Sequence, residues 1–123
     1  MTETWDDKSP IYRQLKERVA SLIMDGTFLE GEAIPSVRQV SSDFKINHLT
    51  VSKAYQELVD AGVLEMRRGR GMYVLNGARK RLLVQSRESF ESNELPQILE
   101  RAEQLGIKPA DLIAKINNLI NGK

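Results

Sequence analysis

The chain has 123 residues, of which 41% are hydrophobic, so it can form one ordinary domain with a short appendage. It contains no cysteine and one histidine, which excludes disulfides, thiolate metal sites, cysteine catalysis and polyhistidine metal sites. No apolar run is long enough to span a bilayer and the acidic N-terminus does not follow the pattern of a secretion signal, so we expect a cytoplasmic protein without a membrane partner, metal or cofactor.

The first predicted helix begins at Ser9 and Pro10, where a side-chain oxygen can cap the helix and proline loses no hydrogen bond. Apolar residues then recur at helical spacing until Gly26, which can end the helix. These positions are Ile11, Tyr12, Leu15, Val19, Leu22 and Ile23. A connector rich in helix breakers follows and runs to Pro35.

The next segment predicts two helices joined by a tight turn. Ser36 can cap the first of them, with Gln39 three residues later completing a capping box. The turn lies at residues 45–46, and Asn47 can cap the following helix. That helix has one apolar face, formed by Val51, Ala54, Tyr55 and Leu58. A helix-turn-helix of this kind can place its second helix in a DNA major groove.

A recognition helix contacts DNA mainly through its N-terminal residues, which here are His48, Leu49, Thr50, Ser52 and Lys53. Asn47, Thr50 and the positive end of the helix suit a phosphate group. His48 and Ser52 can hydrogen-bond a base edge, and Leu49 can pack against a thymine methyl group. The alternative is an ordinary amphipathic helix with a solvated polar face.

Arg38 lies in the first turn of the preceding helix, close to Ser36. A cation at this position opposes the helix dipole, which suggests an external anion as its partner. We therefore include Ser36 and Arg38 in the predicted DNA-binding surface. A salt-bridged arginine is the alternative explanation.

A short hairpin is predicted after the helices, with strands at residues 63–66 and 72–75. Gly69 and Gly71 permit a tight turn and a close approach to another molecule, while Arg67, Arg68 and Arg70 supply positive charge. Such a hairpin can serve as a wing that reaches phosphates or a guanine beside the groove. A solvated turn is the alternative.

The distribution of charge supports a single polyanion-binding face. Residues 34–81 hold nine basic and four acidic side chains, whereas residues 1–33 hold four basic and seven acidic ones. Residues 82–123 hold five basic and six acidic side chains, and the whole chain has a net charge of +1. A basic middle between acidic flanks predicts one binding face, not a generally basic surface.

The remainder of the chain is predicted to be helical. One helix begins near residue 79, and Asn93 can cap another that contains Pro96, so the pattern leaves open one kinked helix or two across residues 79–105. Gly106 ends this stretch, and a last helix begins at residues 108–109. We expect a DNA-binding domain at residues 1–76 and a helical dimerisation region at residues 77–123.

The C-terminal helices carry more apolar surface than a two-helix hairpin can bury against itself, which predicts an interface between two chains. The residues expected to form it are Leu82, Leu83, Leu95, Ile98, Leu99, Ala102, Leu105, Leu112, Ile113, Ile116, Leu119 and Ile120. Pairing two chains would set two recognition helices about 34 Å apart, one turn of DNA. The alternative is a tail that folds back on its own winged helix.

Enzymatic functions find little support. The glycines at 69 and 71 are too few for a phosphate-binding loop, and no nucleophile–base pattern accompanies His48. We expect no catalytic residue.

Several segments together resemble the GntR family of bacterial transcription regulators. They are residues 10–12, residues 31–38 (GEAIPSVR), residues 50–58 (TVSKAYQEL), Gly62 and residues 68–74 (RGRGMYV). The short length and the sequence TVSKAYQEL are similar to its YtrA subfamily. The resemblance covers roughly residues 9–75.

This resemblance implies a mainly α fold with a small β-hairpin: a winged helix-turn-helix followed by a helical dimerisation hairpin. It also implies a homodimeric, sequence-specific repressor of a near-palindromic DNA operator. Family members approach DNA through residues corresponding to Arg38, to His48, Leu49, Thr50 and Ser52, and to Gly69. Many relatives have arginine in place of His48, which shifts the expected base contacts toward the wing and Ser52.

The sequence leaves open whether an effector controls the protein and whether the winged helix binds DNA or another protein. Release of the operator by a small-molecule effector is compatible with the family, but the sequence names no ligand. A winged helix that serves as a protein-interaction adaptor, with its basic wing on an acidic partner, is the alternative function.

Overall fold

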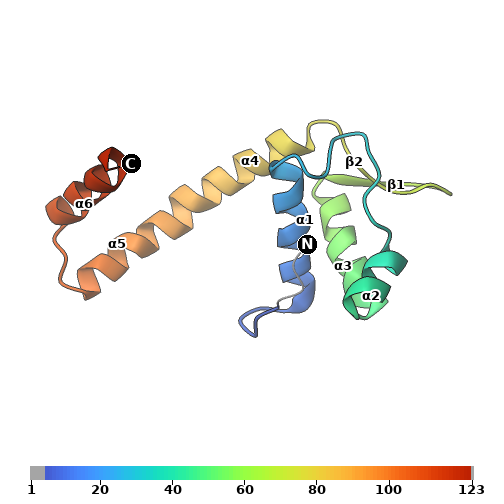
Figure 1. The fold of residues 1–123 in the computed structure, drawn as a ribbon, viewed down its shortest axis with the longest axis horizontal. Helices are drawn as coiled ribbons and strands as arrows, with labels where there is room; N and C mark the ends of the chain where they lie inside the picture. Colours follow the sequence, from blue (N-terminus) through green and yellow to red (C-terminus); the bar gives the residue numbers. More distant parts are fainter. Residues whose placement is uncertain (1–4, 123) are drawn as a thin grey trace. The chain divides into compact units, whose positions relative to one another are not determined.

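The computed structural model describes residues 5–122, which form two compact units divided between Val84 and Gln85 (Figure 1). The first unit confirms the predicted winged helix-turn-helix, because three helices are followed by an antiparallel hairpin. Its elements are α1 (Ile11–Met24), α2 (Val37–Phe44), α3 (His48–Asp60), β1 (Leu64–Arg67), β2 (Gly71–Val74) and the start of α4 (Ala78–Ser89). Ala78 and Leu82 of α4 are buried in the core of this unit, which therefore extends past residue 76.

The start of α1 differs from the prediction in its cap. Pro10, not Ser9, is the N-cap residue, and no side chain caps the helix. The preceding segment is held instead by the buried side chain of Gln14, whose Nε2 donates to the carbonyl oxygens of Ser9 (2.7 Å) and Asp6 (2.8 Å). The Asp6 N–H donates back to Gln14 Oε1 at 3.0 Å. The expected Ser9 cap was wrong because the glutamine supplies the local hydrogen bonds.

The helix-turn-helix has the predicted caps. The Ser36 hydroxyl accepts a hydrogen bond from the Gln39 N–H at 3.0 Å, and the Asn47 side chain accepts one from the Leu49 N–H at 2.8 Å. Lys45 makes the turn with a left-handed φ of 56°. These caps fix where α2 and α3 begin, and so fix which residues of α3 lie at its N-terminal end.

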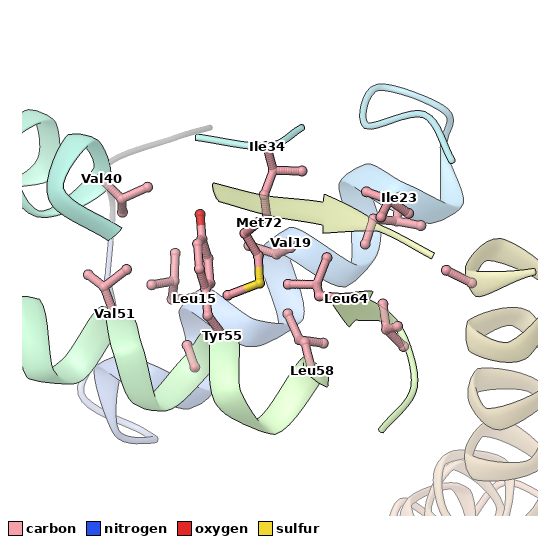
Figure 2. Packing of buried hydrophobic residues seen from close by; sticks show 14 of the residues in the cluster. Leu15, Val19, Ile23, Ile34, Val40, Val51, Tyr55, Leu58, Leu64 and Met72 are labelled. Atoms are coloured by element: carbon pink, nitrogen blue, oxygen red, sulfur yellow. The ribbon is translucent and has the colours of Figure 1, made fainter. Parts of the chain in front are cut away.

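The core of the first unit lies among α1, α2, α3 and the hairpin (Figure 2). The predicted apolar face of α3 is confirmed, since all four of its residues are buried. The Tyr55 hydroxyl donates to the Pro35 carbonyl oxygen at 2.6 Å, and this joins α3 to the residue just before α2. Burial raises the pKa of the Tyr55 hydroxyl above its usual value, so it stays protonated and remains a donor.

The hairpin pairs Leu64 with Val74 and Arg67 with Gly71, one residue away from the predicted strand limits. The connector after α1 runs beside β2, a feature that the sequence did not predict. Gly31 N–H donates to the Val74 carbonyl (2.8 Å) and Ile34 N–H to the Met72 carbonyl (3.0 Å). The connector therefore covers the β2 edge of the hairpin and holds the base of the wing in place.

Residues 78–104 form a continuous helical run, which settles the open question about this segment. A five-residue π-helix, η1 (Phe90–Glu94), separates α4 from α5 (Leu95–Gln104), and the Leu95 N–H donates to the Phe90 carbonyl. Asn93 lies inside this run and caps no helix, contrary to the prediction. The wider π turn accommodates Pro96, whose ring would clash with a carbonyl one α-turn before it.

The second unit begins at Gln85 and ends with a hairpin of α5 and α6 (Pro109–Asn121). Gly106 adopts a left-handed φ of 75° after α5, and the Ile107 N–H donates to the Ala102 carbonyl at 2.8 Å. This arrangement ends α5 and allows the chain to reverse. Among residues 5–122, no helix has the length and apolar character that crossing a bilayer requires.

Candidate nucleic-acid interface

The predicted reading residues occupy the first two turns of α3. His48, Leu49 and Lys53 are exposed, whereas Thr50 and Ser52 are half-buried. Leu49 has 67% of its surface accessible although it is a large apolar side chain. An apolar side chain exposed among small polar ones suits contact with a thymine methyl group and adds nothing to the core.

A surface hollow of about 590 Å³ brings together residues of α2 and α3. It is lined by Val37, Arg38, Ser41, Ser42 and His48. The Arg38 guanidinium and the His48 imidazole, ten residues apart in sequence, thus face one space. Ser36 is exposed next to them, and its hydroxyl oxygen already accepts the capping hydrogen bond. The Ser41 hydroxyl already donates to the Ile46 carbonyl oxygen at 2.5 Å, so the Arg38 guanidinium and the Ser42 hydroxyl are the groups that can accept a phosphate here.

The wing tip consists of Arg68, Gly69 and Arg70, all exposed. The Arg70 N–H donates to the Arg67 carbonyl at 2.8 Å and closes the turn, in which Gly69 has a φ of 75°. A Cβ atom at Gly69 would meet no atom of the chain, so its backbone is open to a second molecule. Among the described residues, neither Arg68 nor Arg70 forms a salt bridge, and their charges are available to an anion.

Arg67 differs from the two arginines at the tip. Its Nε lies 2.8 Å from Glu65 Oε1, and its guanidinium stacks over the Tyr73 ring with the Cζ atom 4.0 Å from the ring centroid. Sequence reasoning placed its charge at the tip and missed this arrangement. The signal was available, since residues two apart on a strand share a face and Glu65 could be paired with Arg67.

Lys53 also has a neighbour that the sequence reasoning missed. Its Nζ atom lies 3.9 Å from the centroid of the Tyr12 ring, on α1. One turn further along both helices, Lys16 Nζ lies 3.1 Å from Glu57 Oε1. The four-residue spacing of Tyr12 and Lys16, matched by Lys53 and Glu57, was the available signal.

These groups all belong to the first unit. In Figure 1, α2 and the tip of the β1–β2 hairpin lie on the side of the unit away from α1, with α3 between α1 and α2. The start of α3, the hollow beside α2 and the arginine tip therefore lie on parts of the first unit other than α1.

The residues predicted for dimerisation differ in exposure: two are buried, one is half-buried and the rest are exposed. Leu82 is buried in the core of the first unit, and Ala102 is 6% exposed within the second. Leu112 is half-buried, while the others are exposed apolar side chains. These exposed residues are Leu83, Leu95, Ile98, Leu99, Leu105, Ile113, Ile116, Leu119 and Ile120. All of them except Leu83, which belongs to the first unit, lie in the second unit, and an apolar surface of this extent on so small a unit is typical of an interface.

The potential metal-ligating side chains of the described residues are scattered. Within the range that the structure describes, no group of three or more His, Asp or Glu side chains is placed to hold a metal ion.

Comparison with known proteins points to regulators of transcription. Residues 11–74 match the family model of bacterial regulatory proteins of the gntR family. Over 100 residues the chain is 35% identical to the HTH-type transcriptional repressor YtrA of Bacillus subtilis, which covers 81% of this chain and 76% of that protein.

Two solved structures are also similar. A GntR family transcriptional regulator from Listeria monocytogenes matches with a TM-score of 0.74 and 27% identity, covering 93% of this chain and 98% of that one. The DNA-binding domain of AraR, in complex with its operator ORX1, matches with a TM-score of 0.53 and 30% identity, over 60% of this chain and 89% of that one. The second match covers a domain seen bound to DNA.

Proposed function

Since this chain belongs to the GntR family of bacterial regulatory proteins, we propose that it is a transcriptional repressor that binds a near-palindromic DNA operator as a homodimer. The family assignment makes it a DNA-binding regulator and not an enzyme, in agreement with the sequence analysis. Repression is proposed because the similar YtrA protein of Bacillus subtilis is a repressor. A regulator of chromosomal genes would act in the cytoplasm, and the absence of cysteine is compatible with that location.

One observation carries the DNA-binding proposal: two separate exposed groups with free charge and hydrogen-bonding capacity lie on the same unit. The N-terminal turns of α3 offer His48, Leu49 and Ser52 to base edges. Arg68 and Arg70 at the wing tip offer charge to phosphates or to a guanine. Both groups are carried by elements of the same compact unit.

Arg38 is proposed to bind a backbone phosphate from α2. The hollow that it shares with His48 can receive the phosphate, and the adjoining helix N-terminus of α3 adds positive potential. Asn47 can take part through its amide NH₂ group, because its amide oxygen accepts the capping hydrogen bond from Leu49.

The homodimer is proposed to form through the second unit. The exposed apolar residues of α5 and α6 continue around a hollow of about 660 Å³ whose lining includes Leu99, Ile107 and Leu112. A second copy of the same helices has the complementary character, since both surfaces are apolar. Two linked DNA-binding units would raise the affinity for a site with two half-sites.

The experiment that tests this function selects bound duplexes from a random-sequence pool and measures the affinity of the winner and of its scrambled version. We expect a near-palindromic winner that binds at least about a thousandfold more tightly than the scrambled duplex at moderate salt. Equal affinities at every salt concentration would remove the proposal and favour the adaptor alternative. A thermal-shift screen with metabolites tests whether an effector binds.

A further inference from the structure

Two side-chain pairs link α1 and α3 along one edge, and they differ in charge. Lys16 is neutralised by Glu57, with 3.1 Å between Nζ and Oε1. Lys53 lies one turn earlier on α3 and is placed over the Tyr12 ring, which carries no charge. Along this edge, the charge of Lys16 is compensated by Glu57, whereas the charge of Lys53, closer to the start of α3, is not compensated by the Tyr12 ring.

We propose that Tyr12 is a positioning residue for DNA binding, which holds the Lys53 ammonium as a preformed phosphate-binding group beside the recognition helix. The inference rests on the proposed function and adds a role for α1, which carries none of the residues predicted to bind DNA. It also assigns Lys53 to the phosphate backbone and leaves base reading to His48, Leu49 and Ser52.

The Tyr12 ring limits the conformational freedom of the Lys53 side chain. A lysine has four rotatable side-chain bonds, and fixing them when DNA binds costs conformational entropy. The Tyr12 ring attracts the ammonium and restricts these rotations before DNA arrives. A lysine that is restrained in the free protein loses less entropy on binding than an unrestrained one.

The Lys53 ammonium group keeps hydrogen-bonding capacity for a ligand. An ammonium group has three N–H donors, and a ring face occupies only the side turned toward it. Lys53 is exposed, and it forms no salt bridge within residues 5–122. An incoming phosphate oxygen can thus bind the outer side of the ammonium while the ring keeps its place.

Lys53 and Arg38 lie against different neighbours of the recognition helix. Arg38 lines the hollow between α2 and the start of α3, whereas Lys53 points to α1. Arg38 thus lies on the α2 side of the recognition helix and Lys53 on the side that packs against α1, with α3 between these two helices in Figure 1. Two phosphate strands border a major groove, and a cation on each side of the inserted helix can meet both of them.

The test compares the full-length wild type with Y12L, Y12F, K53M and the double variant Y12L/K53M on the selected duplex, across a series of salt concentrations. K53M should weaken binding and lower the slope of log affinity against log salt by about 0.9 per chain, the value for one lost phosphate contact. Y12L should weaken binding by about two- to fivefold, the range expected of an exposed cation–π contact. Y12F keeps the ring and should bind like the wild type.

The double variant decides whether Tyr12 acts through Lys53. If it does, Y12L/K53M binds as K53M does, because the ring has no ammonium left to hold. An additive loss in the double variant, or an unchanged salt slope for K53M, would overturn the proposal. The matched control is K16M, which removes the neighbouring cation and should leave the salt slope unchanged.

A measurement on the free protein covers the case in which Y12L is poorly folded. The Lys53 side-chain methylene protons near the ring should show a ring-current shift by NMR in the wild type and in Y12F. An unshifted Lys53 in the wild type would contradict the placement, whatever the DNA affinity of the variants. If the wild type failed to distinguish the selected duplex from the scrambled one, the proposed function would fail, whereas the ring-current shift and the salt slopes on any duplex would still test this inference.

Discussion

The three arginines of the hairpin have different surroundings, which gives them different roles. Arg67 is held by Glu65 and by the Tyr73 ring, so its charge is partly compensated within the protein. Arg68 and Arg70 are exposed and form no salt bridge in the described part of the chain. Three cations within four residues repel one another, and an external anion removes this cost at the tip.

Arg70→Ala should therefore weaken operator binding. Loss of one phosphate contact lowers the salt slope by about one, whereas loss of a guanine contact weakens the selected duplex by about 1–3 kcal/mol and leaves the scrambled one less affected. Fluorescence anisotropy with both duplexes at several salt concentrations measures these effects. If Arg70→Ala bound both duplexes as tightly as the wild type, the wing would have no part in DNA binding.

Leu49 and Ser52 should govern sequence preference instead of overall affinity. Leu49→Ala removes an apolar contact that can recognise a thymine methyl group, and Ser52→Ala removes a hydrogen-bonding group from the same face. We expect each variant to select a different consensus when the random-pool selection is repeated. An unchanged consensus from both would show that α3 does not read bases through this face.

At the scale of elements, a hydrogen bond fixes the connector ahead of α2. The Tyr55 hydroxyl crosses from α3 to the Pro35 carbonyl, and Figure 2 shows Tyr55 within the core with its hydroxyl directed to the segment that contains Ile34. Tyr55→Phe should lower the free energy of unfolding by about 1 kcal/mol, the usual net value of such a bond. Urea denaturation measures this, and a loss well below half that amount would mean that the bond contributes little.

The beginning of α4 is held by Glu30, in the connector after α1, and by the last residue of α1, Met24. The Glu30 carboxylate accepts hydrogen bonds from the Gly77 N–H (3.0 Å) and the Arg79 N–H (3.1 Å), and Arg79 Nε donates to the Met24 carbonyl (2.8 Å). The backbone N–H groups of Gly77 and Arg79 hold the pKa of Glu30 below its usual value. These contacts fix the start of α4 within the first unit.

A pH-dependent contribution to stability follows from this lowered pKa. The folded-state pKa of Glu30 lies below its unfolded value, so the stabilisation is complete above about pH 4.5 and is lost as the pH falls through the folded value. Glu30→Gln should therefore lower the melting temperature at pH 7, and the difference from wild type should shrink below about pH 4.5.

Glu32→Gln is the matched control for Glu30→Gln. Glu32 belongs to the same loop, but its side chain forms no hydrogen bond with the residues that the structure describes, so its replacement should leave the melting temperature unchanged. A Glu30→Gln difference that stayed constant from pH 7 to pH 3 would contradict the capping role.

Local signals predicted most elements, and the failures share a physical cause. Caps at Ser36 and Asn47 depend on neighbours within three residues, and both were predicted correctly. The predicted Ser9 cap was wrong because the Gln14 side chain makes the local hydrogen bonds. The predicted Asn93 cap was wrong because Asn93 lies within the π-helix that precedes Pro96. The Tyr12–Lys53 contact and the strand-like pairing at residues 31–34 join segments distant in sequence, where a single sequence gives only weak signals.

The proposed binding of a near-palindromic operator requires two copies of the chain. Ile116 lies in the middle of the apolar stripe of α6 and is 43% exposed. Ile116→Asp should convert a dimer into a monomer at micromolar concentration, because a buried, unpaired carboxylate is strongly unfavourable at an apolar interface. Asn118→Asp, on the opposite side of the same helix, introduces the same charge and should remain dimeric.

Analytical ultracentrifugation distinguishes these states, and operator affinity should fall together with dimerisation because the two DNA-binding units then bind separately. A wild type that sediments as a monomer at these concentrations would remove the proposed homodimer. The fold of the first unit and its DNA-binding face would still stand.

DNA cleavage from single positions on the protein shows whether α3 and the wing tip contact the same duplex. The sequence has no cysteine, so a single introduced cysteine can carry a tethered iron chelate that cleaves nearby DNA. His48→Cys and Arg68→Cys should both cleave the selected operator, at adjacent positions within each half-site, while Glu17→Cys on an exposed part of α1 should not. Cleavage from only one of the two positions, or equal cleavage along the whole duplex from both, would contradict a joint interface of recognition helix and wing.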